Sequence, residues 1–138
     1  YLLTPNGIKE KTRLTYEFLK YSYIYIREIR RKTREILSPL ARQGKKRIVF
    51  YGGGEIAELA YLSVRELGMT LVTVLDLDLL NQYCVDRVIQ GLEWFESDDG
   101  ADALLILKSL SNRCDLSQQL MKYAEEKNMA LIPFFPLD

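Results

Sequence analysis

One stretch, RIVFYGGGEIAELAYLSV at residues 47–64, constrains the fold of this chain more than any other. A continuous apolar run reaches three glycines, and a segment with helical periodicity follows at once. Such a run is typical of a strand buried in a parallel sheet, and the glycines allow a tight turn into the next helix. We therefore expect a strand at residues 46–52 and a helix from Glu55 to about Leu67, closed by Gly68.

The rest of the chain repeats this alternation. It predicts further strands at residues 70–76, 87–91, 101–107 and 129–135. A helix is expected from Asp115 to about Lys127, with Asp115 and Gln118 in the positions of a capping box. Strands that alternate with helices predict an α/β fold: a doubly wound parallel sheet of about five strands, with right-handed crossovers and the order 3-2-1-4-5.

The segment before this sheet predicts a long N-terminal α-helix. We expect a short strand that ends at Thr4, with Thr4 as the helix N-cap and Pro5 in the first helical position. No helix breaker follows until Ser38–Pro39, so the helix should run for about 30 residues, roughly 45 Å. The expected division of the chain is a helical segment at residues 1–44 and an α/β domain at residues 45–138.

Apolar or neutral side chains recur along this helix with a period of about 3.5 residues. They are Leu14, Phe18, Tyr21, Ser22, Tyr25, Ile26, Ile29, Thr33, Ile36 and Leu37. A small domain cannot cover so long a stripe, which predicts a homodimer formed through the helix about a two-fold axis. Packing of the stripe along its own domain is the alternative.

Charge is distributed unevenly between the two parts of the chain. Residues 1–47 carry 13 Lys and Arg against 4 Asp and Glu, whereas residues 48–138 carry 6 against 15. A basic segment of this kind can meet nucleic acid, or it can meet the acidic half of its own protein.

Several classes of site and location are disfavoured by composition. The chain has no histidine, and Cys84 and Cys114 match no metal or redox spacing, so we expect no metal site and a reduced, cytoplasmic location. No apolar run approaches the roughly 20 residues that span a bilayer, so no membrane contact is expected. Because the chain begins at Tyr1 rather than at Met, we expect it to be part of a longer protein.

The glycines match the dinucleotide-binding pattern G-x-G-x-x-G/A at Gly52, Gly54 and Ala57. Gly52 allows the turn, Gly54 allows a pyrophosphate to approach the backbone, and Ala57 lets the helix lie close to the strand. Asp76, 24 residues beyond Gly52, ends the next predicted strand and can accept hydrogen bonds from ribose hydroxyls, which favours NAD over NADP. Asp78 is a second candidate for this role.

One residue argues against a phosphate at this turn. Glu55 stands at the start of the helix, where a carboxylate is favoured by the helix dipole but repels a phosphate. Small residues are also needed at any tight turn between a strand and a helix. A purely structural turn is therefore the alternative to a nucleotide site.

The front segment YLLTPNGIKEKTRLTYEFLK resembles the end of a winged-helix DNA-binding domain of MarR-like bacterial regulators, where the wing leads through a TPxG sequence into a long dimer helix. The resemblance covers about 20 residues. It implies that DNA is bound only through a winged-helix domain that is absent from this chain.

Residues 46–135 resemble Rossmann-type nucleotide- or CoA-binding domains, including the sensor half of redox-sensing repressors that pair a winged helix with an NADH site. The resemblance implies a nucleotide-type small molecule, with NAD(H) as the candidate, held by Gly52, Gly53 and Gly54, with Asp76 on the ribose. Lys108 and Ser109 would border the same cleft. The first helical residues, Glu55 and Ile56, complete the predicted binding set.

The sequence is compatible with three functions. The first is the effector-binding and dimerising portion of a transcriptional regulator, which is the prediction we adopt. The second is a fragment of a nucleotide-dependent enzyme, sugar-nucleotide or NAD-linked, suggested by the Y-x-x-x-K spacing of Tyr16 with Lys20 and of Tyr123 with Lys127. The third is a Rossmann unit without a ligand that serves only association.

Overall fold

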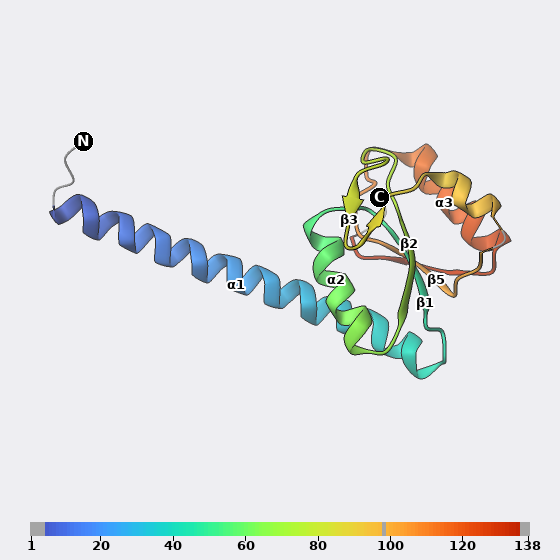
Figure 1. Cartoon of the computed structure of the whole chain (residues 1–138), viewed down its shortest axis with the longest axis horizontal. Helices are drawn as coiled ribbons and strands as arrows, with labels where there is room; N and C mark the ends of the chain where they lie inside the picture. Colours follow the sequence, from blue (N-terminus) through green and yellow to red (C-terminus); the bar gives the residue numbers. More distant parts are fainter. Residues whose placement is uncertain (1–4, 98, 136–138) are drawn as a thin grey trace.

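The computed structural model describes residues 5–97 and 99–135. A long helix leads into an α/β domain, and the first half of that helix extends away from the domain (Figure 1). The short strand and the Thr4 cap expected at the start of the chain lie outside the described residues, as does the side chain of Leu14.

The long helix α1 spans Pro5–Arg42 and contains Pro39, so the prediction that it ends at Ser38–Pro39 was wrong. Pro39 lies in the last turn and removes one helical hydrogen bond there, and Leu40 beyond it is buried against the domain. The helix ends in a Schellman motif: Gly44 has φ +78° and donates to Ala41 O at 3.2 Å, and Lys45 donates to Leu40 O at 2.9 Å.

The parallel sheet has four strands in the order β2-β1-β5-β6. Their bounds are β1 Arg47–Tyr51, β2 Thr70–Leu75, β5 Ala103–Ile106 and β6 Ala130–Pro133. Helix α2 (Glu55–Glu66) follows β1, and helix α3 (Cys114–Glu126) lies between β5 and β6. Tyr51 pairs with Leu75 on one side and with Ile106 on the other, so the carboxyl ends of three strands meet at one edge.

The expected strand at residues 87–91 is not a full member of this sheet. Its first residues form β4 (Arg87–Val88), which pairs antiparallel with β3 (Tyr83–Cys84) in a small hairpin. Gln90 alone makes a parallel bridge to Leu75, and the chain then turns at Gly91 into the short 3-10 helix η1 (Leu92–Glu96). The described sheet therefore has four strands instead of about five, with one bridge where the third was expected.

Helices cover both faces of the sheet, as expected of a doubly wound arrangement. One core joins α1 and α2 to the sheet through side chains such as Leu37, Phe50 and Val64. The other joins α3 and η1 to the opposite face through side chains such as Tyr51, Phe95 and Leu120.

Helix α3 begins differently from its prediction. Arg113 is the N-cap, Cys114 is the first helical residue, and no side-chain hydrogen bond caps the helix. The capping box expected from Asp115 and Gln118 is therefore not formed. This start leaves Arg113 outside the helix, in the loop that follows β5.

The apolar stripe of α1 divides into two parts. Ile29, Thr33 and Leu37 are buried, so the second half of the helix packs along its own domain. The first half has exposed aromatic and aliphatic side chains. They are Tyr16, Phe18, Leu19, Tyr21, Tyr23, Ile24, Tyr25 and Ile26.

Candidate functional site

The glycine turn lies at the carboxyl end of β1, as the sequence predicted. Gly52 has φ +119°, and a Cβ atom there would lie 3.1 Å from Lys108 Cβ and 3.3 Å from the Leu107 carbonyl carbon. Gly54 has φ +110°, and a Cβ atom there would meet nothing within 4 Å. Gly52 is thus required for the close approach of the loop after β5, whereas Gly54 borders open space.

Gly53, the middle residue of the turn, is covered by the segment that follows β2. A Cβ atom on Gly53 would lie 2.6 Å from Ile89 Cδ1 and 3.2 Å from Leu79 Cδ1. The Gly53 amide donates to Asp76 Oδ2 at 3.0 Å. A carboxylate of the protein therefore receives the amide that could otherwise bind a ligand phosphate.

Asp76 is almost fully buried, with 1% of its surface exposed. Its Oδ1 accepts from the Asp78 amide at 2.9 Å, and both its oxygens lie near Lys108 Nζ, at 3.1 and 3.3 Å. Asp76 is the predicted ribose ligand, and a ribose could reach it only if some of these contacts were given up.

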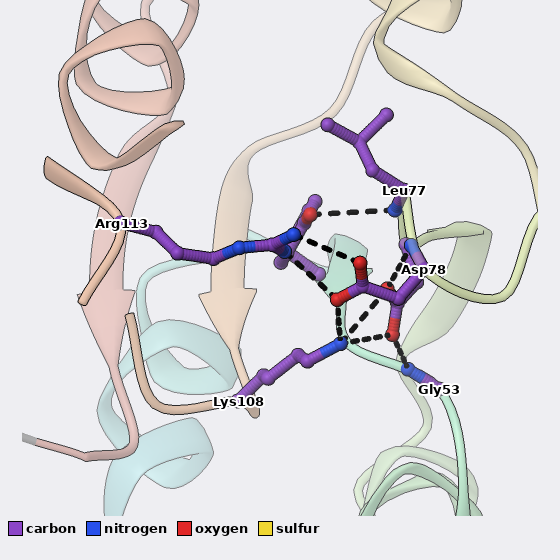
Figure 2. A network of polar contacts seen from close by, with 7 residues as sticks. Gly53, Leu77, Asp78, Lys108 and Arg113 are labelled. Carbon is purple, nitrogen blue, oxygen red and sulfur yellow. Dashed lines mark hydrogen bonds and ion pairs between the residues drawn. The ribbon is translucent and has the colours of Figure 1, made fainter. Parts of the chain in front are cut away.

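Asp78 lies at the same carboxyl edge of the sheet and is held there by two basic side chains from the loop after β5. Lys108 Nζ donates to Asp78 Oδ2 at 2.6 Å. Arg113 forms a bidentate ion pair with Asp78, in which its two terminal nitrogens donate to Oδ2 and Oδ1, both at 2.8 Å. Figure 2 shows Lys108 and Arg113 reaching from the loop after β5 towards Asp78, beside Gly53. Two acidic and two basic groups thus join the loops that follow β1, β2 and β5.

The contacts among Asp78, Lys108 and Arg113 favour the charged form of each of these three side chains. Hydrogen bonds from Lys108 and then from Arg113 lower the pKa of Asp78 below its ordinary value. Burial alone would lower the pKa of Lys108, but its hydrogen bonds to Asp78 and Asp76 outweigh burial and leave that pKa raised. The pKa of Arg113 is also raised, first by its hydrogen bonds to Asp78.

Tyr51 contacts the backbone next to this cluster. Its hydroxyl oxygen accepts a hydrogen bond from the Leu77 amide at 3.3 Å, and burial raises the pKa of this phenol. The hydroxyl therefore fixes the start of the segment that carries Asp78.

The other predicted site residues lie apart from these contacts. Ser109 donates to Ser111 Oγ at 3.3 Å, and Ile56 packs against the core beneath α2. Glu55 lines a groove between α2 and the exposed part of α1, together with Tyr21 and Tyr25. The structure brings together the three glycines, Asp76, Asp78 and Lys108 out of the predicted set.

Sequence reasoning missed Arg113 and Tyr51. Arg113 is the last residue before α3, in the loop whose first residues, Lys108 and Ser109, were predicted to border the cleft. The signal available was its position in this loop, because the whole segment between a strand and the next helix lies at the carboxyl edge of a parallel sheet. Tyr51 was assigned only to the apolar strand.

A groove adjoins Arg113 on the side of α3. Leu77, Asn112–Asp115, Leu116 and Gln119 line it, and its volume is about 550 Å³. It provides space next to the cluster for part of a small molecule.

The second pair with Y-x-x-x-K spacing, Tyr123 and Lys127, makes contacts away from the glycine turn. Tyr123 stacks on Phe95 with ring centroids 4.7 Å apart, and Lys127 donates to the Ser97 carbonyl at 3.0 Å. Tyr16 of the first pair is exposed on the part of α1 that extends from the domain.

Within residues 5–97 and 99–135, no three His, Cys, Asp or Glu residues are grouped closely enough to hold a metal ion. In the same part of the chain, none of the helices combines the length and apolar character needed to cross a bilayer. Comparison of the sequence with protein-family models, with curated proteins and with solved structures gave no match. The resemblance to MarR-like and redox-sensing regulators therefore stays a prediction.

Proposed function

We propose that this chain is the ligand-sensing and dimerisation portion of a transcriptional regulator, and that it binds a nucleotide-type effector at the glycine turn. The observation that supports the proposal best is the composition of the carboxyl edge of the sheet at the glycine turn, where we place the ligand crevice. There the open face of Gly54, the β1–α2 turn and the basic loop after β5 meet at the carboxyl edge of a parallel sheet. Ligands of doubly wound sheets bind at this edge, where neighbouring helices leave on opposite faces.

NAD(H) is the effector class that we place first. Its pyrophosphate would lie near Gly54, whose surroundings are open. Asp78, with 42% of its side chain exposed, is easier for a ribose to reach than Asp76. Either carboxylate would have to exchange an internal hydrogen bond for one to the ribose.

The test is calorimetry of the full chain with NADH, NAD, NADP, CoA and nucleotide sugars, comparing Gly54→Ala with Gly68→Ala. Both glycines have positive φ, +110° and +70°, and a Cβ atom at either position meets nothing within 4 Å. Both variants therefore carry backbone strain, which is larger at Gly54 because its φ of 110° with ψ of −159° is a conformation that only glycine adopts readily. Only Gly54 lies at the crevice. We expect binding to weaken in Gly54→Ala alone, and equal affinity in the two variants would contradict the proposed site.

The dimerisation part of the proposal is supported by the exposed half of α1. Tyr21 is 72% exposed and Phe18 is 68% exposed, although each is a large apolar side chain. Together with Glu58, Leu59 and Leu62 of α2 they border a groove of about 850 Å³. A contiguous apolar surface of this kind is typical of an interface, and a second copy supplies the matching helix.

Tyr21→Glu combined with Tyr25→Glu should separate the dimer. Ile29, which shares the same sequence stripe, is unsuitable for this test because it is buried in the protomer's own core. Met121→Glu is the matched control, since Met121 is exposed and lies on α3. Analytical ultracentrifugation should show a dimer for the native chain and for the control, and a native chain that sediments as a monomer would refute the proposal.

A Rossmann-like scaffold without a ligand is the second candidate function. One specific observation favours it: the Gly53 amide already donates to the Asp76 carboxylate, and Leu79 and Ile89 cover Gly53. This amide is therefore not available to a ligand. If no compound in the calorimetric series releases heat, with the native chain or with Glu55→Gln, this candidate replaces the sensor. DNA recognition is proposed only through a domain outside this chain, so this chain alone should bind DNA weakly and with strong salt dependence.

A further inference from the structure

Lys108 and Arg113 converge on a single exposed carboxylate. All three side chains are accessible: 42% of Asp78, 31% of Lys108 and 40% of Arg113 is exposed. Arg113 presents both terminal nitrogens to both Asp78 oxygens, the geometry in which arginine also binds phosphate.

The two carboxylates of the cluster differ in what holds them. Asp76 is buried and accepts from the Gly53 and Asp78 amides, so it is part of the fold. The side-chain oxygens of Asp78 contact only the two basic groups among the hydrogen bonds found in the described chain. If Asp78 turned away, Lys108 would keep Asp76 as its counter-ion, and Arg113 would face the crevice without a carboxylate hydrogen-bonded to it.

We propose that Lys108 and Arg113 form the binding site for a phosphate group of a small molecule, and that the Asp78 carboxylate occupies this site until the ligand displaces it. The inference rests on the proposed function, because it assigns a phosphate of the same effector to Lys108 and Arg113, as the alternative to a pyrophosphate near Gly54 with a ribose on Asp78. The groove beside Arg113 would then take the remainder of the ligand.

Displacement is favourable for an electrostatic reason. An exposed carboxylate that leaves its ion pair regains water, and exposed ion pairs contribute little to stability. A phosphate dianion brings more charge and more acceptor oxygens to the same two cations than a carboxylate does. The net gain should be largest at low ionic strength, where exposed charges are least screened.

The experiment is isothermal titration of the full chain with inorganic pyrophosphate at low ionic strength, comparing the native chain with Asp78→Asn, Asp86→Asn and Arg113→Gln. Asp78→Asn removes the competing charge and should tighten binding by about tenfold. Asp86→Asn is the matched control, because Asp86 is an exposed, ion-paired carboxylate of the neighbouring hairpin and the variant changes net charge equally. The control should bind like the native chain, and Arg113→Gln should lose measurable binding.

Each outcome decides the question. Tighter binding in Asp78→Asn that is abolished in the double variant with Arg113→Gln supports the site. Equal affinities of Asp78→Asn and Asp86→Asn, unchanged binding in Arg113→Gln, or no heat with any variant would overturn it. Circular dichroism on all variants verifies that they are folded.

The same variants separate this inference from the proposed function. If Asp78→Asn binds pyrophosphate tightly but no nucleotide binds to any variant, the phosphate site stands and the nucleotide sensor fails. If a nucleotide binds the native chain and Asp78→Asn equally, the sensor stands and displacement of Asp78 is refuted.

Discussion

Replacing Asp76 with alanine should destabilise the protein by about 3 kcal/mol. The substitution leaves two backbone donors, the Gly53 and Asp78 amides, without their acceptor, and it removes one of the two carboxylates that contact Lys108. A donor left unpaired in a buried setting costs about 1–3 kcal/mol, and the lower half of that range applies to each amide because both lie near the surface. The remaining cost comes from Lys108, which keeps only one of its two carboxylate partners.

Asp78→Ala is the matched comparison for this prediction. It removes the neighbouring carboxylate from the same two cations, but Asp78 is exposed and its side chain caps no backbone donor of the turn. Its effect on stability should be much smaller. The pair therefore isolates the contribution of the buried hydrogen bonds to the glycine turn.

Urea denaturation followed by the fluorescence of Trp94 measures both variants, because this is the sole tryptophan and it is buried. In thermal denaturation, a loss of about 3 kcal/mol in stability should lower the melting temperature of a domain of this size by roughly 10 °C. If Asp76→Ala proved no less stable than Asp78→Ala, the structural role of Asp76 would be refuted. The carboxylate would then be free to act as the predicted ribose ligand.

Three further substitutions and one control have defined outcomes in the same assay. Tyr51→Phe should cost about 1 kcal/mol at neutral pH, because the Leu77 amide loses its acceptor. Burial raises the pKa of Tyr51 in the folded chain above its ordinary value of 10.0. The stabilisation from this hydroxyl is therefore complete below pH 10 and declines above it. The difference in the free energy of unfolding between the native chain and Tyr51→Phe should thus become smaller as the pH rises above 10. Gly53→Ala should cost about 1–3 kcal/mol, because the new Cβ forces Ile89 to move. Leu37→Ala, at a fully buried site, should cost about 2–5 kcal/mol, whereas Leu19→Ala in the isolated protomer should cost far less.

The sheet could be predicted from the sequence because its strands are short apolar runs that end in turn residues. The order β2-β1-β5-β6 agrees with the expected order once the third strand is left out. That strand failed because Val88 and Ile89 are apolar enough to suggest one, whereas residues 83–88 form a local hairpin with a two-residue turn, in which Val85 takes a φ of +64° that no feature of the sequence predicts. Pattern alone does not distinguish a hairpin arm from an edge strand of this length.

The end of α1 was misjudged for a related reason. Pro39 ends a helix on local grounds, but burial of Leu37 and Leu40 against the domain outweighs the loss of one helical bond. The division of its stripe into a buried half and an exposed half depends on where the domain lies along the helix. Periodicity carries no information about that position.

At the candidate site, the glycines and both aspartates could be placed from spacing, because strand ends converge at one edge of a parallel sheet. The identity of their partners could not be placed. The contact of Asp76 with Gly53, and the two-pronged contact of Arg113 with Asp78, depend on tertiary distances across three loops. Through these contacts, carboxylates of the protein itself pair with the Gly53 amide and with Arg113.

Helix α2 connects the proposed ligand site at the glycine turn with helix α1, which carries the proposed dimer surface. Coupling between ligand binding and dimerisation can therefore be measured. It begins at Glu55, beside the glycine turn, and ends at Glu66, which pairs with Arg30 and Arg34 of α1. If a ligand at the turn strengthens the dimer, dimerisation must raise ligand affinity by the same factor, because coupling between two binding events is reciprocal.

We therefore expect the ligand affinity of the native chain to rise with protein concentration across the dimerisation range. The Tyr21→Glu and Tyr25→Glu double variant should bind the same ligand with the weaker affinity of the monomer at every concentration. The Met121→Glu control should follow the native chain, because its exposed side chain lies on α3. An affinity that is independent of concentration and equal in all three proteins would show that the crevice and the helix surface act separately, whether or not each of them binds its own partner.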